Sequence, residues 1–258
     1  MALPVTIDDG FVRLIDSCFQ PDEFVAISPA AENEEGEIVP RRGVTLTTSE
    51  WKSKVAAKGG IDRVFGTKLG LFLRINPMAK GGAKNEDVTA FRHVLVEFDR
   101  DEAGKLIPKE EQYHAVVASG MPVAALIDSG NKSLHAWIRV DAPDEKEYKR
   151  RVEIIWGWFS GINLDKQNRN PSRLSRCPDG WRTVDGDITL EQDYQRLFGS
   201  YVYNGITLPI ENARMNGTEI RFAVNGVEYS GRVDGDVMQG EAKGRRTVAW
   251  RATRVRTQ

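Results

Sequence analysis

The sequence predicts an α+β protein with a larger mixed part followed by a small all-β part. Helical periodicity alternates with short apolar, β-branched runs up to about residue 200. Beyond that point, short strand patterns are separated by tight-turn pairs such as Asn225-Gly226. A chain of 258 residues can hold one large domain and an appendage. We therefore expect one domain over 1–200 and a second over 201–258.

The first eighty residues predict an N-terminal α/β unit. An apolar helical pattern over 11–19 precedes a strand candidate at 24–28. Four glutamates, two arginines and turn formers over 30–43 predict an exposed loop. A helix is expected over 49–57, with Ser49 as its cap, and the apolar run 69–77 predicts a buried strand.

The middle of the chain predicts the order strand, helix, hairpin, helix. The strand is expected over 93–99, and a helix over 109–119 ends at Gly120. Two strands on either side of Gly130 and Asn131 are expected to form an antiparallel hairpin. An amphipathic helix over 144–158 follows Pro143.

The C-terminal part predicts a four-strand antiparallel meander. Its strands are expected over 219–224, 227–233, 236–242 and 247–255. The last sixteen residues contain six basic side chains and no acidic one. This composition fits either a contact with nucleic acid or a solvated tail.

Composition and charge narrow the class of protein. A formal net charge of −1 gives no general attraction to nucleic acid, so any polyanion site must be local. The two cysteines, Cys18 and Cys177, match neither a disulfide framework nor a zinc pattern, so no zinc site is expected. No apolar run approaches the roughly 18 residues of a membrane span. We expect a cytoplasmic protein without a membrane partner.

Two acids end the strand predicted at 93–99. Glu97 and Asp99 are two residues apart, so their side chains point to the same side of an extended strand. Their hard oxygen ligands favour Mg²⁺ or Mn²⁺, and Asp101 and Glu102 are reserve ligands. The alternative is an exposed strand end with two solvated acids.

The segment from Ser129 to Trp137, SGNKSLHAW, has the chemistry of a phosphate site. Lys132 supplies a point charge, and Ser133 and His135 alternate onto one face of the following strand. The alternative is a hairpin turn with an exposed lysine and a histidine bonded to a neighbour.

A cluster of basic residues follows Asp165. Lys166, Arg169, Arg173, Arg176 and Arg182 outnumber the two acids of the segment 164–182. Guanidinium groups suit phosphate oxygens, and Arg173 and Arg176 would share one face if the chain beyond Pro171 were helical. The alternative is a solvated basic loop.

Together these residues resemble the archaeo-eukaryotic primase superfamily, the primase-polymerases. The matches occur in order: the acid pair of VEFD, the Ser-x-His of SLH, and LD with Asp165 ahead of NPSRLSR. The resemblance covers roughly residues 60–190. It implies an RRM-like antiparallel sheet packed beside an N-terminal α/β unit.

The resemblance also implies an activity, a metal-dependent DNA primase or polymerase. Glu97, Asp99 and Asp165 would be its catalytic acids and would bind two Mg²⁺ or Mn²⁺ ions. The incoming nucleoside triphosphate would be held by five residues: Lys132, Ser133, His135, Arg173 and Arg176. The partners would be a DNA template and primer and, because the chain has no P-loop, a separate helicase.

Two other functions compete with this interpretation. A plasmid- or phage-type replication initiator would use the same fold to bind DNA without synthesis. An HUH-type nicking enzyme needs two histidines around one hydrophobic residue, and His93, His114 and His135 are widely scattered. The histidine spacing argues against the nicking enzyme.

Overall fold

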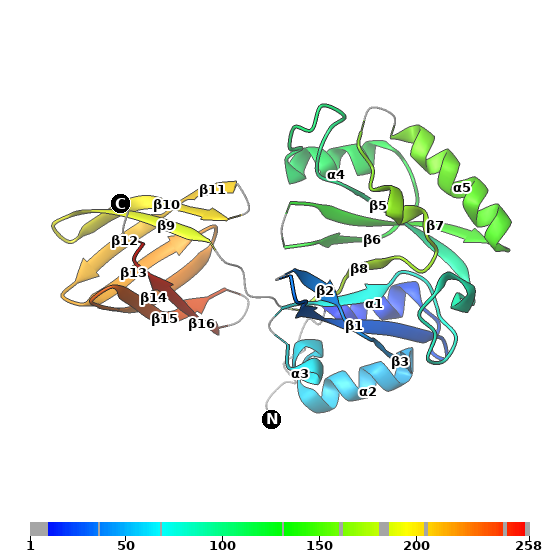
Figure 1. Cartoon of the computed structure of the whole chain (residues 1–258), viewed down its shortest axis with the longest axis horizontal. Coiled ribbons are helices and arrows are strands. Elements are labelled where there is room, and N and C mark those ends of the chain that lie inside the picture. Colours follow the sequence, from blue (N-terminus) through cyan, green and yellow to red (C-terminus); the bar gives the residue numbers. More distant parts are fainter. Residues whose placement is uncertain are drawn as a thin grey trace, which may run out of the picture. The chain divides into compact units, whose positions relative to one another are not determined.

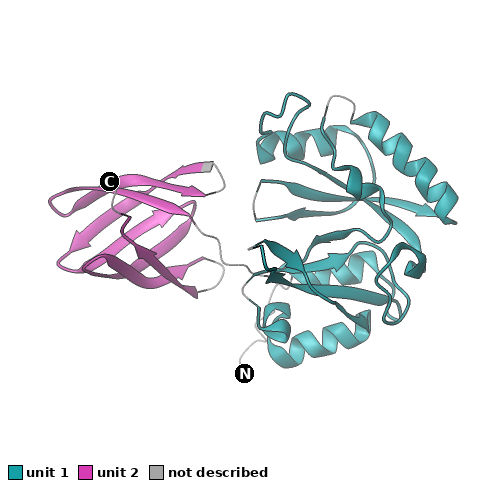
Figure 2. Ribbon diagram, in the orientation of Figure 1, with its two compact units in different colours: residues 1–183 teal, residues 184–258 magenta. Residues whose placement is uncertain are grey.

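The computed structural model divides the chain into two compact units, residues 1–183 and 184–258 (Figure 2). It describes residues 10–35, 37–67, 69–130, 132–159, 162–180, 186–203, 206–244 and 247–255. The expected boundary near residue 200 lies inside strand β10 (Arg196–Tyr203). This strand pairs along its whole length with β9 (Asp187–Asp193), and the hairpin ties these residues to the second unit. The mixed part is therefore shorter than the sequence predicted.

The first sheet of unit 1 has five strands, all antiparallel to their neighbours. They run in the order β2-β1-β4-β8, with β3 also paired to β1. Their bounds are β1 Phe24–Glu32, β2 Ile38–Pro40, β3 Val44–Thr47, β4 Leu71–Arg74 and β8 Leu174–Arg176. The expected exposed loop over 30–43 thus contains β2, because its apolar part, Ile38–Pro40, pairs with the end of β1. The segment beyond Pro171 is strand β8 rather than a helix, since β4 offers it a free edge.

Three helices accompany this sheet: α1 (Gly10–Cys18), α2 (Thr48–Lys58) and α3 (Ile61–Phe65). The predicted cap Ser49 lies inside α2, and Thr47 caps the helix instead. Thr47 accepts from the main-chain nitrogen of Glu50 and the Glu50 carboxylate accepts from that of Thr47, which forms a capping box.

The second sheet of unit 1 has three strands in the order β5-β7-β6: β5 Phe91–Phe98, β6 Val123–Asp128 and β7 Leu134–Ala142. The pairing of β6 with β7 is antiparallel, as predicted for this hairpin. Asn131, expected in its turn, lies outside the described residues. The expected helices are α4 (Lys109–Ala118) and α5 (Glu145–Trp158).

The three-stranded sheet is covered on both faces (Figure 1). One face packs Val94, Val96 and Ile138 against Val116 of α4 and Val152 of α5. The other face shares a core with α1 and β4, to which Leu95, Ile127, Trp137, Phe11 and Leu73 all belong. Burial on both faces explains the continuous apolar run of β5.

Unit 2 is one eight-stranded antiparallel sheet, in which the four predicted strands form only half. They are β13 (Glu219–Val224), β14 (Val227–Asp234), β15 (Val237–Lys243) and β16 (Thr247–Thr253). They pair in sequence, as expected of a meander. β9, β10, β11 (Ile206–Pro209) and β12 (Glu211–Asn216) complete the sheet. Its core includes Leu197, Ile220 and Phe222.

Taken together, the chain is α+β with several antiparallel sheets. Two short 3₁₀ helices, η1 (Asn85–Asp87) and η2 (Lys166–Arg169), complete the elements of unit 1. Among the described residues, no helix combines the length and apolar character that crossing a bilayer requires.

Candidate functional site

Glu97, near the end of β5, is the centre of the candidate site. It lies opposite His135 in the β5–β7 register. Ser133 Oγ donates to Glu97 Oε1 at 2.8 Å, and His135 Nε2 lies 3.2 Å from the same oxygen. Ser133 and His135 therefore face one side of the sheet, as their spacing predicted, and they meet the first predicted acid there.

The second ring nitrogen of His135 is held by β8, a strand of the other sheet. The main-chain N–H of Arg176 donates to His135 Nδ1 at 3.2 Å. The hydroxyl group of Ser175 lies 3.0 Å from the same nitrogen and accepts from Trp137 Nε1 at 3.0 Å. With Nδ1 as an acceptor, the neutral ring carries its proton on Nε2 and donates it to Glu97.

Ser175, His135 and Glu97 have the connectivity of a serine–histidine–carboxylate triad, but not its chemistry. Ser175 is fully buried, so no substrate reaches its oxygen. Its hydroxyl group also serves both His135 and Trp137. Ser175 therefore orients the imidazole ring and is no nucleophile.

Glu97 is held in its ionised form. Burial of the side chain opposes ionisation, but the hydrogen bonds from His135 and Ser133 and the positive charge of Arg173 outweigh it. Together they lower the pKa of Glu97 to about 2. The site thus presents a buried carboxylate with fixed orientation.

Asp165 and Arg173 form a pair beside the end of β5. The main-chain nitrogen of Asp165 lies 3.5 Å from the carbonyl oxygen of Glu97. Asp165 Oδ1 accepts from the main-chain nitrogen of Gln167 at 2.9 Å, and Oδ2 accepts from Arg173 Nη2 at 2.7 Å. Asp165 therefore caps η2 and neutralises Arg173.

The other predicted residues lie around this centre. Arg176 contributes its main-chain nitrogen, and its guanidinium group lies 4.2 Å from the ring centre of Phe72. Arg173 and Arg176 do not share a helical face, because the chain is extended at β8. The main-chain carbonyl oxygen of Lys132 accepts from Gln112 Nε2. The main-chain carbonyl oxygen of Asp99 accepts from the main-chain nitrogen of Ile107.

The three predicted acids do not form a metal cluster. No group of three or more histidine, cysteine or acidic side chains in the described part of the chain is placed to hold a metal ion. Glu97 is engaged by Ser133 and His135, and Asp165 is engaged by Arg173.

Two polar groups near the Asp165–Arg173 pair have no hydrogen-bond partner among the described residues. One is the side-chain amide of Asn168, a fully buried residue, with both its nitrogen and its oxygen unpaired; the other is Nε of Arg173. Buried polar groups without a partner are rare in folded proteins. Sequence reasoning overlooked Asn168 and Ser175. Ser175 could have been found from strand alternation. In a strand over 174–176 its side chain points to the face opposite to those of Leu174 and Arg176.

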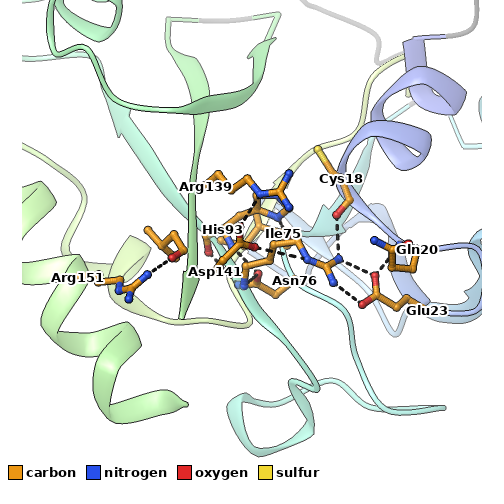
Figure 3. A network of polar contacts seen from close by, with 11 residues as sticks. Cys18, Gln20, Glu23, Ile75, Asn76, His93, Arg139, Asp141 and Arg151 are labelled. Atoms are coloured by element: carbon orange, nitrogen blue, oxygen red, sulfur yellow. Dashed lines mark hydrogen bonds and ion pairs between the residues drawn. The ribbon is translucent and has the colours of Figure 1, made fainter. Parts of the chain in front are cut away.

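A second polar network lies at the other end of β5 and joins the two sheets (Figure 3). The Asn76 side chain accepts from the main-chain nitrogens of Arg92 and His93 and donates to the carbonyl oxygens of His93 and Pro171. Every hydrogen-bonding position of this buried amide is used. Arg92 makes a bidentate pair with Glu23 at 2.6 and 2.7 Å. These contacts fix the sheets that carry the candidate site.

Comparisons of the chain with protein-family models, curated proteins and solved structures found no match. The function must therefore be argued from the chain itself.

Proposed function

We propose that this protein is a metal-dependent nucleotidyltransferase of the primase-polymerase type. It adds nucleotides to a nucleic-acid 3′ end, or initiates primers on a DNA template, from nucleoside triphosphates. The observation that carries the proposal is the contact of Ser133 and His135 with one oxygen of Glu97. This contact joins two of the three motifs on which the resemblance rests, although they lie 36 residues apart in sequence.

The third motif lies beside the first two. Asp165 follows the end of β5 closely in space, and Arg173 is near enough for its charge to lower the pKa of Glu97. In the proposed reaction, Arg173 exchanges Asp165 for the phosphates of the incoming nucleotide. Once Arg173 has left Asp165, its Nε, which has no hydrogen-bond partner among the described residues, supplies a further donor for the nucleotide.

His135 and Ser133 hold Glu97 in a fixed orientation. A proton on Nε2 of His135 and the hydroxyl group of Ser133 both donate to the carboxylate, which keeps it charged. Lys132 adds positive charge at the start of β7 for the triphosphate.

The donor set fits a hard divalent ion in part. Glu97 is ionised, and Asp99 follows two residues later, just beyond the end of β5, so these two carboxylates would hold Mg²⁺ or Mn²⁺. Asp165 becomes available to a second ion only when Arg173 leaves it. Bound ions would neutralise phosphate charge and activate the attacking hydroxyl group.

Primer extension and de novo synthesis with Mg²⁺ or Mn²⁺ test the proposal. We expect Glu97→Gln combined with Asp99→Asn to abolish synthesis. The matched control is Glu145→Gln, which removes an exposed carboxylate paired with Lys149 on α5 and should leave synthesis unchanged. Undiminished synthesis by the Glu97→Gln, Asp99→Asn variant would overturn the assignment.

A second candidate is a DNA-binding replication initiator without synthetic activity. The Asp165–Arg173 pair favours it, since a carboxylate neutralised by arginine is a poor metal ligand. DNA binding by the wild-type protein, with no nucleotide incorporated under either metal, would select this candidate. Metal-dependent incorporation would reject it.

A further inference from the structure

Three arginines lie side by side across three strands of unit 2. In the sheet register Arg196 of β10 is opposite Arg214 of β12, and Arg214 is opposite Arg221 of β13. Directly opposed side chains have Cβ atoms roughly 4.5–5.5 Å apart. The arginine row (Arg196, Arg214 and Arg221) therefore concentrates three positive charges within about 10 Å.

The arginine row faces solvent. Its members alternate with Leu197, Ala213, Ile220 and Phe222, which are buried in the core on the other face of the sheet. All three arginines are exposed. Among the described residues, none of the three guanidinium groups makes a hydrogen bond or an ion pair.

Like charges directly opposite each other destabilise a sheet. Asp193 of β9 is opposite Arg196 at one end of the row, and Ser230 of β14 is opposite Arg221 at the other. Asp193 is therefore the one acidic residue directly opposite a member of the row, while Glu219 and Glu228 lie diagonal to Arg214 and Arg221. A partner with several negative charges would relieve this repulsion.

Two exposed aromatic rings lie beside the row. Phe198 is two residues from Arg196 on the same side of β10, and 54% of it is exposed. Tyr194, in the turn before β10, is 91% exposed. Large exposed rings next to arginines are typical of surfaces on which bases stack while the backbone contacts positive charges.

We propose that this face of unit 2 binds single-stranded nucleic acid. The arginine row contacts consecutive phosphates, and Phe198 stacks on a base. The aromatic rings favour this partner over an acidic protein or an anionic lipid surface, which offer no bases. The inference goes beyond the proposed function, because it concerns another unit and requires no synthesis.

Fluorescence anisotropy of the full chain with a labelled single-stranded DNA of mixed sequence tests it, in chelator and without nucleotides. Each phosphate contact to single strands contributes about 0.7 to the slope of log affinity against log salt. We therefore expect Arg196→Gln, Arg214→Gln and Arg221→Gln together to reduce that slope by about 2 and the affinity by at least tenfold. Phe198→Ala should weaken binding about tenfold and leave the slope unchanged.

The matched control removes three charges that already have acidic partners: Lys149→Gln, Arg150→Gln and Arg254→Gln. This control should retain the wild-type slope. The proposal is wrong if the arginine-row variant keeps the wild-type DNA affinity and salt slope. It is also wrong if the control variant loses as much affinity and slope as the arginine-row variant. Equal binding of anionic vesicles and DNA, insensitive to Phe198→Ala, would also overturn the proposal.

Folding is checked by thermal unfolding. The arginine-row variant should unfold close to the wild-type temperature, because the loss of repulsion between the arginines offsets the loss of the attraction between Arg196 and Asp193. The single variant Arg214→Gln, at the middle of the row, provides a second test and should still reduce the slope. Because the assay contains neither metal nor nucleotide, its result is independent of whether unit 1 synthesises nucleic acid.

Discussion

The hydroxyl group of Ser175 lies 3.0 Å from Nδ1 of His135 and joins two sheets of unit 1 at the candidate site. Ser175 belongs to β8 of the five-stranded sheet and His135 to β7 of the three-stranded sheet. The same hydroxyl group accepts the indole N–H of Trp137, which is fully buried. One serine therefore satisfies two buried rings and orients the one that contacts Glu97.

Ser175→Ala should lower the free energy of unfolding by about 1–3 kcal/mol, because the buried N–H of Trp137 loses its acceptor. It should also reduce any synthetic activity, since the His135 ring loses one of its two Nδ1 contacts. Urea denaturation measures the first effect and primer extension the second. Ser53→Ala is the control, because its exposed hydroxyl group donates only to a helical carbonyl oxygen. Equal stability of both variants would contradict the role of Ser175.

Glu97 should contribute stability that is lost in acid. Its pKa is about 2 in the folded protein, below the ordinary value of about 4.5, so the unfolded chain takes up the proton first. Stability from this group is complete above about pH 4.5 and falls as the pH drops toward 2, by up to about 2–3 kcal/mol. Glu97→Gln should flatten the difference between urea unfolding at about pH 5 and about pH 3. A pH dependence identical to the wild type would refute this.

His93 should make the protein less stable below neutral pH. Burial lowers its pKa to about 4, while its Nδ1 lies 2.9 Å from the carbonyl oxygen of Ile75. The unfolded histidine takes up a proton near pH 6.5, so stability falls as the pH drops from there to about 4, by at most about 3 kcal/mol. Melting temperatures across this range should fall less steeply for His93→Gln than for the wild type. His114→Gln, at a side chain that is 68% exposed, is the control and should follow the wild type.

Thr47→Ala should cost about 1 kcal/mol of unfolding free energy, because the capping box of α2 is lost. Ser49→Ala should cost less, since the Ser49 hydroxyl group donates to the carbonyl oxygen of Pro21 and caps nothing. Parallel urea titrations of the two variants measure the difference. A larger loss for Ser49→Ala would show that the cap was assigned to the wrong residue.

Many local elements of this protein can be read from its amino-acid pattern alone. The apolar run of β5, the helix α4 that stops before Gly120, the β6–β7 hairpin and the four-strand meander follow from periodicity and turn residues. The amino-acid pattern also placed Ser133 and His135 on one face, because alternation along a strand is a local property.

Which strands share a sheet, and what each candidate residue contacts, depends on long-range packing. The strand at β8 forms because β4 offers an edge, and the residues at β9–β12 join the meander through pairing that no local pattern encodes. Folding also pairs Asp165 with Arg173 and brings Ser133 and His135 into contact with Glu97. It places the Ser175 hydroxyl group between the rings of His135 and Trp137. These choices depend on groups distant in sequence that are buried together, where each must find a hydrogen-bond partner or lose the stability of its contacts with water.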